Sequence, residues 1–320
     1  MPGERIHEAL RLVLGELPDL PHLPELPGRG AVADMTGRAT AVVAELGFDL
    51  QPAGWRLTGG GSGVDHRRAR SLLAEDLDAL EELTEGYEGE LKVQVAGPWT
   101  LAATVERPRG DRVLADVGAR RELAQALAEG LGAHVADVRR RVPGARVLVQ
   151  VDEPALPAVL AGGVPTASGF HRHRTVDAPR ASEALEWVFE AVRDAAAMPV
   201  AHCCAADVPV ALLRGAGAAA VSVDLAALAA EGYDALGAAL DDGDRVFLGV
   251  VPATDPPRPQ EERSVVDRVL RLLDMLGLGP DEVGDRLVLT PACGLAGASA
   301  SYAREALALV RTAASRLASG

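Results

Sequence analysis

Short, continuously apolar segments alternate with longer amphipathic segments along most of this chain, and this alternation constrains its fold more than any other feature. The short segments are rich in valine and read as strands buried on both faces, as in a parallel sheet covered by helices. The predicted strands are Leu91–Ala96, Arg146–Val151, Pro199–Cys203, Ala219–Asp224, Val246–Val251 and Leu287–Thr290, with a weaker one at Phe48–Gln51.

The amphipathic segments between these strands repeat apolar residues at helical spacing. They are Ile6–Leu17, Leu114–Val142, Ser182–Ala196, Ser264–Leu276 and Ser299–Leu317. Repeated strand-then-helix units require parallel strands joined by right-handed crossovers. The sequence therefore predicts an α/β fold of the (β/α)8 TIM-barrel type, as a single domain over residues 1–320.

One strand is missing from this count, because seven strands are predicted and a closed barrel needs eight. Only Met1–Arg5 precedes the first helix, so we expect the first strand to be absent or shortened. The proline-rich stretch Leu17–Pro27 is expected to be a long first loop rather than a domain linker.

Composition excludes several classes of partner. The formal net charge is −14, which argues against nucleic acid and anionic membranes. No apolar run is long enough to span a membrane, and the amino terminus lacks the apolar region of a signal peptide. Three cysteines cannot form a disulfide framework. A cytoplasmic protein with free thiols is expected.

The cysteines occupy the ends of two predicted strands, with a histidine beside them. His202 and Cys204 lie two residues apart, so on an extended chain both face one side while Cys203 faces the other. Cys293 follows the last strand, whose carboxyl end meets the others on one face of a barrel. Asp224 closes an intervening strand and is predicted as a fourth ligand. This ligand set suits Zn²⁺.

Such a site favours one kind of chemistry. Zinc held by two thiolates, an imidazole and a carboxylate retains little charge with which to activate water. It is better suited to bind an incoming thiol, lower its pKa and keep it as a nucleophile at neutral pH. The predicted reaction is alkylation of a thiol.

Two further motifs follow predicted strands. Asp152 and Glu153 end a buried strand before Pro154, where either carboxylate could hold a substrate ammonium group or begin a helix. Asp152 is also the candidate catalytic residue. Trp99 follows Gly97-Pro98 and could form an apolar wall of a substrate site, or belong to a tight turn between strand and helix.

With these motifs the chain resembles the catalytic barrel of the cobalamin-independent methionine synthase family. The resemblance extends from Gly97 to the carboxyl terminus. The residues that carry it are Gly97-Pro98-Trp99-Thr100-Leu101, Asp152-Glu153-Pro154-Ala155, His202 with Cys204, Asp224, and Pro291-Ala292-Cys293-Gly294-Leu295. It implies zinc, a methyltransferase activity with homocysteine or a similar small thiol as acceptor, and an Asp152 carboxylate that binds the amino group of that acceptor.

The chain also departs from the family pattern. The family's ligand Glu is Asp224 here, one methylene shorter, and its Gly-Ser motif on the first strand has no counterpart. The family's Asp-Ile-His segment, a source of a proton donor, is replaced by Val251–Asp255. No second acidic residue for the substrate amine is evident, and nothing corresponds to the family's amino-terminal barrel.

Three readings remain open from sequence. The first is zinc-dependent methyl transfer from a folate or a corrinoid, with or without a partner protein that delivers the methyl group. The second is a metal-free decarboxylase resembling uroporphyrinogen decarboxylase, which would line its mouth with arginines. The third is a catalytically degenerate barrel that binds a thiol.

Overall fold

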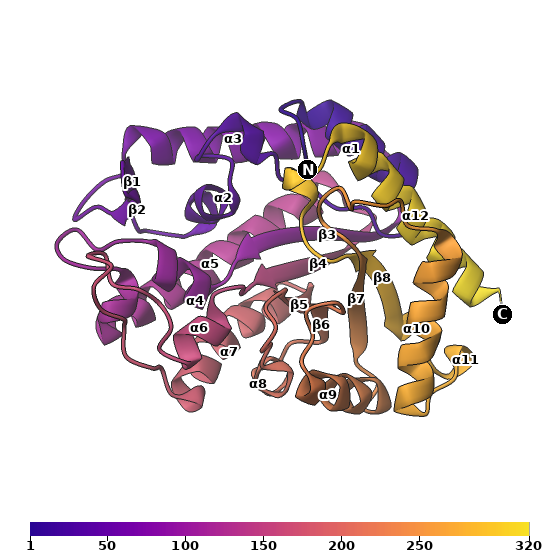
Figure 1. Cartoon of the computed structure of the whole chain (residues 1–320). Helices are drawn as coiled ribbons and strands as arrows, with labels where there is room; N and C mark the ends of the chain where they lie inside the picture. Colours follow the sequence, from indigo (N-terminus) through magenta and orange to yellow (C-terminus); the bar gives the residue numbers. More distant parts are fainter. Residues whose placement is uncertain (320) are drawn as a thin grey trace.

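Six parallel strands form the central sheet of the computed structural model, which describes residues 1–319 (Figure 1). The strands are β3 (Gly89–Ala96), β4 (Ala145–Asp152), β5 (Met198–Cys203), β6 (Ala220–Asp224), β7 (Arg245–Val251) and β8 (Leu287–Pro291). They are hydrogen-bonded in chain order, and all pairs are parallel. The sheet curls as part of a barrel does, and all six of these predicted strands are confirmed.

Helices cover the outer face of this curled sheet (Figure 1). They are α1 (Ile6–Glu16), α2 (Met35–Val42), α3 (Val64–Leu83), α4 (Pro98–Thr104), α5 (Val117–Arg141), α6 (Leu156–Leu160), α7 (Ala178–Asp194), α8 (Val210–Gly215), α9 (Ala230–Asp241), α10 (Glu262–Leu276), α11 (Pro280–Val283) and α12 (Ala300–Ala318). The five helices expected from periodicity are confirmed as α1, α5, α7, α10 and α12. None of the helices in the described part of the chain is long and apolar enough to cross a membrane.

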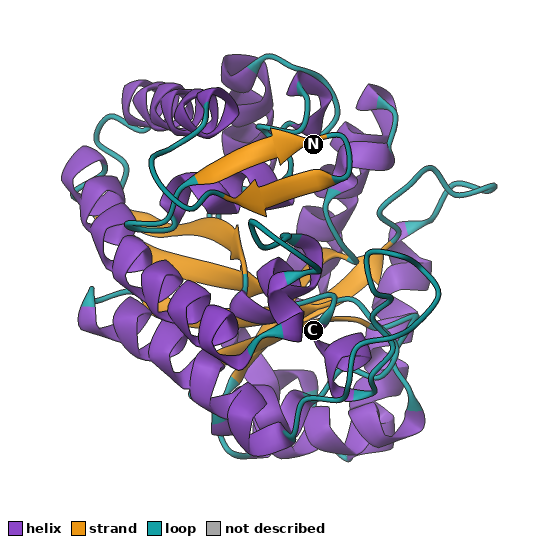
Figure 2. Ribbon diagram, turned by 90° about the vertical axis from the view of Figure 1, so that its left-hand side faces the viewer, coloured by secondary structure: helices purple, strands orange, loops and turns teal. Residues whose placement is uncertain are grey.

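The seventh predicted strand does not join the barrel sheet. Phe48–Gln51 forms β1 and pairs antiparallel with β2 (Gly54–Leu57) in a separate two-stranded sheet (Figure 2). Its four residues are followed by a tight turn and a second short strand, not by a helix, so no crossover carries it into the parallel sheet.

A full eight-stranded barrel is not present in the described residues. Beside β3 runs the proline-rich segment, where His22 forms a single parallel bridge with Lys92. Leu23 N donates to Lys92 O at 3.0 Å, and Lys92 N donates to Pro21 O at 2.9 Å. Prolines on both sides of this bridge cannot donate to a ladder, so the pairing does not extend. The expected long loop therefore contributes one bridge in place of a strand.

On β4, β5 and β6, the inner face changes from apolar to polar toward the carboxyl end. At the amino ends, Leu148, Val200, Ala220 and Phe247 form a small buried cluster of their own. Side chains alternate between the two faces of a strand, so the next positions on this inner face are Gln150, His202 and Ser222, and then Asp152 and Cys204. An apolar floor thus lies beneath a layer of polar side chains at the carboxyl ends.

The close approach of α5 to the end of α2 generates a test of the packing. A Cβ built on Gly130 would lie 1.9 Å from Val42 O, whereas one built on Gly132 meets nothing within 4 Å. We expect Gly130→Ala to lower the free energy of unfolding by about 1–3 kcal/mol through overpacking. Gly132→Ala, the matched control on the same helix, should raise it by about 0.5–1 kcal/mol. Urea denaturation of both variants checks this, and equal effects would contradict the packing described.

Candidate metal centre and substrate cavity

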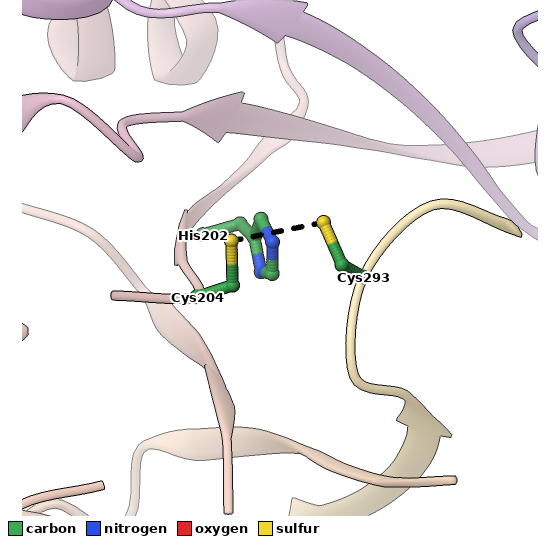
Figure 3. Close-up of side chains that lie close together, drawn as sticks. All are labelled: His202, Cys204 and Cys293. Atoms are coloured by element: carbon green, nitrogen blue, oxygen red, sulfur yellow. Dashed lines mark hydrogen bonds between the residues drawn. The ribbon is translucent and has the colours of Figure 1, made fainter. Parts of the chain in front are cut away.

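His202, Cys204 and Cys293 converge at the carboxyl ends of β5 and β8 (Figure 3). One ligand atom from each lies within 4.8 Å of the others, and the two sulfur atoms are 3.7 Å apart. The convergence follows from the sheet: His202 and Cys204 share a face because they are two residues apart, and β8 brings Cys293 to the same rim. An imidazole and two thiols in this arrangement fit a tetrahedral thiophilic metal ion.

Ser222 orients the histidine of this group. The Nδ1 atom of His202 and the Oγ atom of Ser222 are 2.9 Å apart, and both side chains are buried. A partner on one ring nitrogen fixes the ring and leaves Nε2 as the metal ligand. Sequence analysis did not identify Ser222, although a serine at an inward position of an otherwise apolar strand was the available signal.

The two thiols are electrostatically coupled. The sulfur atoms of Cys204 and Cys293 share a hydrogen bond. It lowers the pKa of the Cys293 thiol and raises that of Cys204, because Cys204 donates once Cys293 is a thiolate; a hydrogen bond with His202 lowers the Cys293 pKa further. Burial lowers the pKa of His202, but Cys293 and Asp152 outweigh it and the net shift is upward. Without a metal, the cluster therefore holds a thiolate at Cys293 next to a readily protonated imidazole, and a metal ion bound there would take the place of that proton.

Cys203 lies outside the cluster, as its position in the strand predicts. Its side chain is fully buried in the main hydrophobic core. Burial raises the pKa of the Cys203 thiol to about 11. It is therefore an unreactive core residue.

Asp224 is not brought into the cluster. Its Oδ1 atom accepts a hydrogen bond from the backbone N–H of Ala226 at 2.9 Å, and its carboxylate does not belong to the group of mutually close ligand atoms. A side chain this short turns back onto the loop that follows β6. The fourth-ligand assignment stays a prediction, and the present conformation leaves that position open.

A cavity of about 1040 Å³ extends from the cluster into the half-barrel. Asp152 lines it, buried on β4 opposite His202 of β5. The Nε2 atom of Gln150 donates to Asp152 Oδ1 at 2.7 Å. Burial raises the pKa of Asp152, whereas His202, the Gln150 hydrogen bond and Lys92 lower it. The carboxylate thus faces the cavity with one oxygen held by an amide.

Glu25 supplies a second acid in this cavity, from the proline-rich segment beside β3. Burial raises its pKa, the Arg38 guanidinium opposes that shift, and the charge of Asp152 raises it further. The Oε1 atom of Glu25 lies 3.5 Å from Arg38 Nε in an ion pair, and the Oε1 atom of Gln94 is buried without a hydrogen-bond partner. Sequence analysis found no second acid, because Glu25 precedes all the matched motifs.

Glu153 and Trp99 lie away from this cavity. Glu153 is fully buried and accepts hydrogen bonds from the backbone N–H groups of Trp99 and Thr100, at 2.9 and 2.7 Å, and from the Thr100 hydroxyl at 2.7 Å. The Trp99 indole donates to Ala181 O at 3.0 Å and stacks under Arg120. Of the two readings of each residue, the structure favours the helix start for Glu153 and the strand-to-helix turn for Trp99.

The arginines that line the cavity are both engaged. Arg245 forms a bidentate pair with Glu90, at 2.8 and 3.0 Å, and Arg311 pairs with Glu16 at 3.1 Å. A decarboxylase that binds several propionate groups needs unengaged arginines at its mouth. The cavity does not offer that arrangement.

Comparisons with known proteins give a family match and one superposition that covers the whole fold. The model of the family described as "Cobalamin-independent synthase, Catalytic domain" matches residues 88–316. A B12-independent methionine synthase from Shewanella sp. W3-18-1, solved in complex with selenomethionine, superposes with a TM-score of 0.63 at 14% identity, covering 98% of this chain and 87% of that chain.

The carboxyl transferase domain of Rhizobium etli pyruvate carboxylase, solved with 3-bromopyruvate, aligns over 75% of this chain and 42% of that chain. Its TM-score is 0.28 at 13% identity, which is too low to indicate a shared fold. A search of curated sequences finds no significant match. The first superposition supports a TIM-like architecture for the curled sheet.

The hydrogen bonds of Glu153 generate one prediction. Glu153→Gln places an amide N–H group against a backbone N–H group, which we expect to cost about 1–3 kcal/mol of unfolding free energy. Metal content should not change, because this side chain reaches no ligand. Glu190→Gln, an exposed change on α7, is the matched control. Loss of metal from a folded Glu153→Gln protein would contradict the assignment.

The charge state of the thiols generates a second prediction. In metal-free protein, the lowered pKa of Cys293 should keep it as a thiolate below neutral pH. Its alkylation by iodoacetamide should therefore stay nearly constant between pH 6 and 8, whereas an ordinary thiol gains about tenfold per pH unit. Cys204→Ala removes the donor and should restore the pH dependence. Peptide mass spectrometry measures both rates, and a steep rise in the unsubstituted protein would refute the lowered pKa.

Proposed function

Because this chain belongs to the cobalamin-independent synthase family through its catalytic domain, we propose that it transfers a methyl group to the thiol of homocysteine or a similar small thiol. The observation that carries the proposal is the convergence of His202, Cys204 and Cys293 at the mouth of a cavity lined by acids. The product would be methionine or a related thioether.

Zinc is the metal that this donor set fits, with His202, Cys204 and Cys293 as its ligands. Three protein ligands and one free position are typical of catalytic rather than structural zinc sites. When bound, zinc would supply the positive charge that lowers the pKa of an acceptor thiol at neutral pH. Ser222 would keep the His202 ring in place for this role.

The acids of the cavity would bind the amino group of the acceptor. An ammonium group has three donors, and the cavity offers Asp152, Glu25, whose carboxylate also pairs with Arg38, and the side-chain oxygen of Gln94. Two of these three acceptors are carboxylates, which form the stronger, charge-assisted hydrogen bonds. The amine would thereby fix the direction in which the thiol reaches the rim.

The reaction exchanges one bond for another. The acceptor sulfur forms a bond to the methyl carbon while the bond between that carbon and the donor breaks, and the thiol proton leaves the sulfur. With methyl-tetrahydrofolate as donor, the broken bond is carbon–nitrogen, and the nitrogen takes up a proton. Asp255, in the segment where the family has its proton donor, instead caps α12 through Ser299 at 2.6 and 2.7 Å.

A folate donor is favoured over a corrinoid, because the matched family is described as cobalamin-independent. We also propose that residues 1–320 form one functional domain that works in the reducing cytoplasm, where both thiols remain available. The alternative is a barrel that binds a thiol without turnover, and an assay of methyl transfer distinguishes it from an enzyme.

Metal analysis provides the first test. Protein purified without a histidine tag should carry about one zinc per chain, and Cys293→Ser or Cys204→Ser should lose most of it. Cys203→Ala, a core cysteine outside the cluster, is the matched control and should keep its zinc. Asp224→Asn should keep zinc as well if the fourth position is open. Unsubstituted protein that binds no zinc would overturn the proposal.

Activity provides the second test, on the zinc-loaded protein. Methyl transfer from methyl-tetrahydrofolate to homocysteine should be lost in Cys293→Ser and retained in Cys203→Ala. Methyl-corrinoid should be assayed in parallel as the other donor. Stoichiometric zinc with homocysteine binding but no transfer from either donor would identify a thiol-binding barrel instead.

A further inference from the structure

Lys92 is the only lysine of the chain, and it lies inside the cavity. It stands on β3 at an inward position, in register with Leu148 of β4. Its Nζ atom donates to Gln150 Oε1 at 2.9 Å. Neither the metal cluster nor the proposed amine site uses this ammonium group.

The ammonium group of Lys92 lacks a carboxylate partner, unlike the arginines of the same cavity. Within residues 1–319, Arg245 pairs with Glu90 and Arg311 pairs with Glu16, whereas no salt bridge includes Lys92. Burial lowers the pKa of Lys92, and the charges of Asp152, Glu25 and Cys293 raise it. Burying a cation without a direct counter-ion is energetically costly, and an anion that binds beside Lys92 would reduce that cost.

Gln150 connects this cation to Asp152. A protonated amine can only donate, so the side-chain oxygen of Gln150 must face Lys92 and its nitrogen must face Asp152. The distances agree, at 2.9 Å on the lysine side and 2.7 Å on the aspartate side. A positive and a negative group are therefore held side by side along the cavity wall, separated by one amide.

This pair of charges complements an α-amino acid, which carries an ammonium and a carboxylate on the same carbon. We propose that the Lys92 ammonium binds the carboxylate of the acceptor thiol, so that Lys92 and Asp152 together select a zwitterionic substrate. The proposal rests on the proposed function and narrows its substrate class to amino-acid thiols.

Two thiols that differ only in the carboxylate test the assignment. Homocysteine carries it, and 3-mercaptopropylamine is the same molecule without it. In calorimetric titrations of zinc-loaded protein, Lys92→Met should raise the Kd of homocysteine about 10- to 100-fold, because a charge-assisted contact is lost. The Kd of 3-mercaptopropylamine should change by less than about threefold. Lys92→Arg should restore part of the homocysteine affinity.

The control variant is Arg146→Met, which removes one exposed positive charge from neighbouring β4 outside the cavity lining. It should leave both Kd values unchanged. Zinc content and thermal unfolding of Lys92→Met show whether the site is intact. Equal weakening of both thiols in a folded, zinc-loaded Lys92→Met protein would overturn the inference.

A measurement on the unsubstituted protein makes the test independent of how Lys92→Met folds. With ¹⁵N-lysine labelling, the chain gives one side-chain signal. Homocysteine should shift it and 3-mercaptopropylamine should not; the same response to both would refute carboxylate binding. If zinc-loaded protein binds neither thiol, the proposed function itself fails. If it binds both and Lys92 senses no difference, only the present inference fails.

Discussion

The parallel register of β4, β5 and β6 is the constraint on which the site depends. Asp152 lies opposite His202, and His202 lies opposite Ser222, so one row across the sheet carries the amine-binding acid, the metal ligand and the residue that orients it. Because side chains alternate along a strand, a shift of one residue in any of these pairs would turn its polar groups into the helical layer. The buried apolar cluster of Leu148, Val200, Ala220 and Phe247 favours this register, because a one-residue shift would remove its members from the inner face.

That register also places opposite charges close together in a partly enclosed space. The thiolate of Cys293, the carboxylates of Asp152 and Glu25, and the cations of His202 and Lys92 shift one another's pKa values. Removing one of these charges leaves its neighbour without compensation, which costs more than an exposed ion pair would. Bound ligands would compensate these charges. A metal cation would do so at the two sulfurs, a substrate ammonium at Asp152 and Glu25, and a substrate carboxylate at Lys92.

Much of this arrangement could be predicted from sequence, for identifiable reasons. Continuous valine-rich segments identified six strands, and the spacing of His202 and Cys204 placed both on one face. The position of Cys293 beside them could be predicted because the carboxyl ends of parallel strands meet at one rim of a barrel. Glu25 could not be found in this way, because it belongs to no strand or helix and reaches the cavity only through the bridge between His22 and Lys92. Phe48–Gln51 has the composition of a strand, but pairing with its immediate neighbour prevailed over joining the distant sheet.

The conformations of Glu153 and Asp224 show a further limit of motif reading. Each ends a strand beside a functional residue, and each carries a carboxylate that could reach a ligand. The backbone N–H groups nearby decide the outcome: Glu153 accepts from those that begin α4, which precedes it in the chain, and Asp224 accepts from the turn after β6. Backbone N–H groups at a helix start or a turn need acceptors, and a carboxylate that lies beside them satisfies that need. Asp152 escapes this competition because its partner is the side chain of Gln150, which leaves the second oxygen for a substrate.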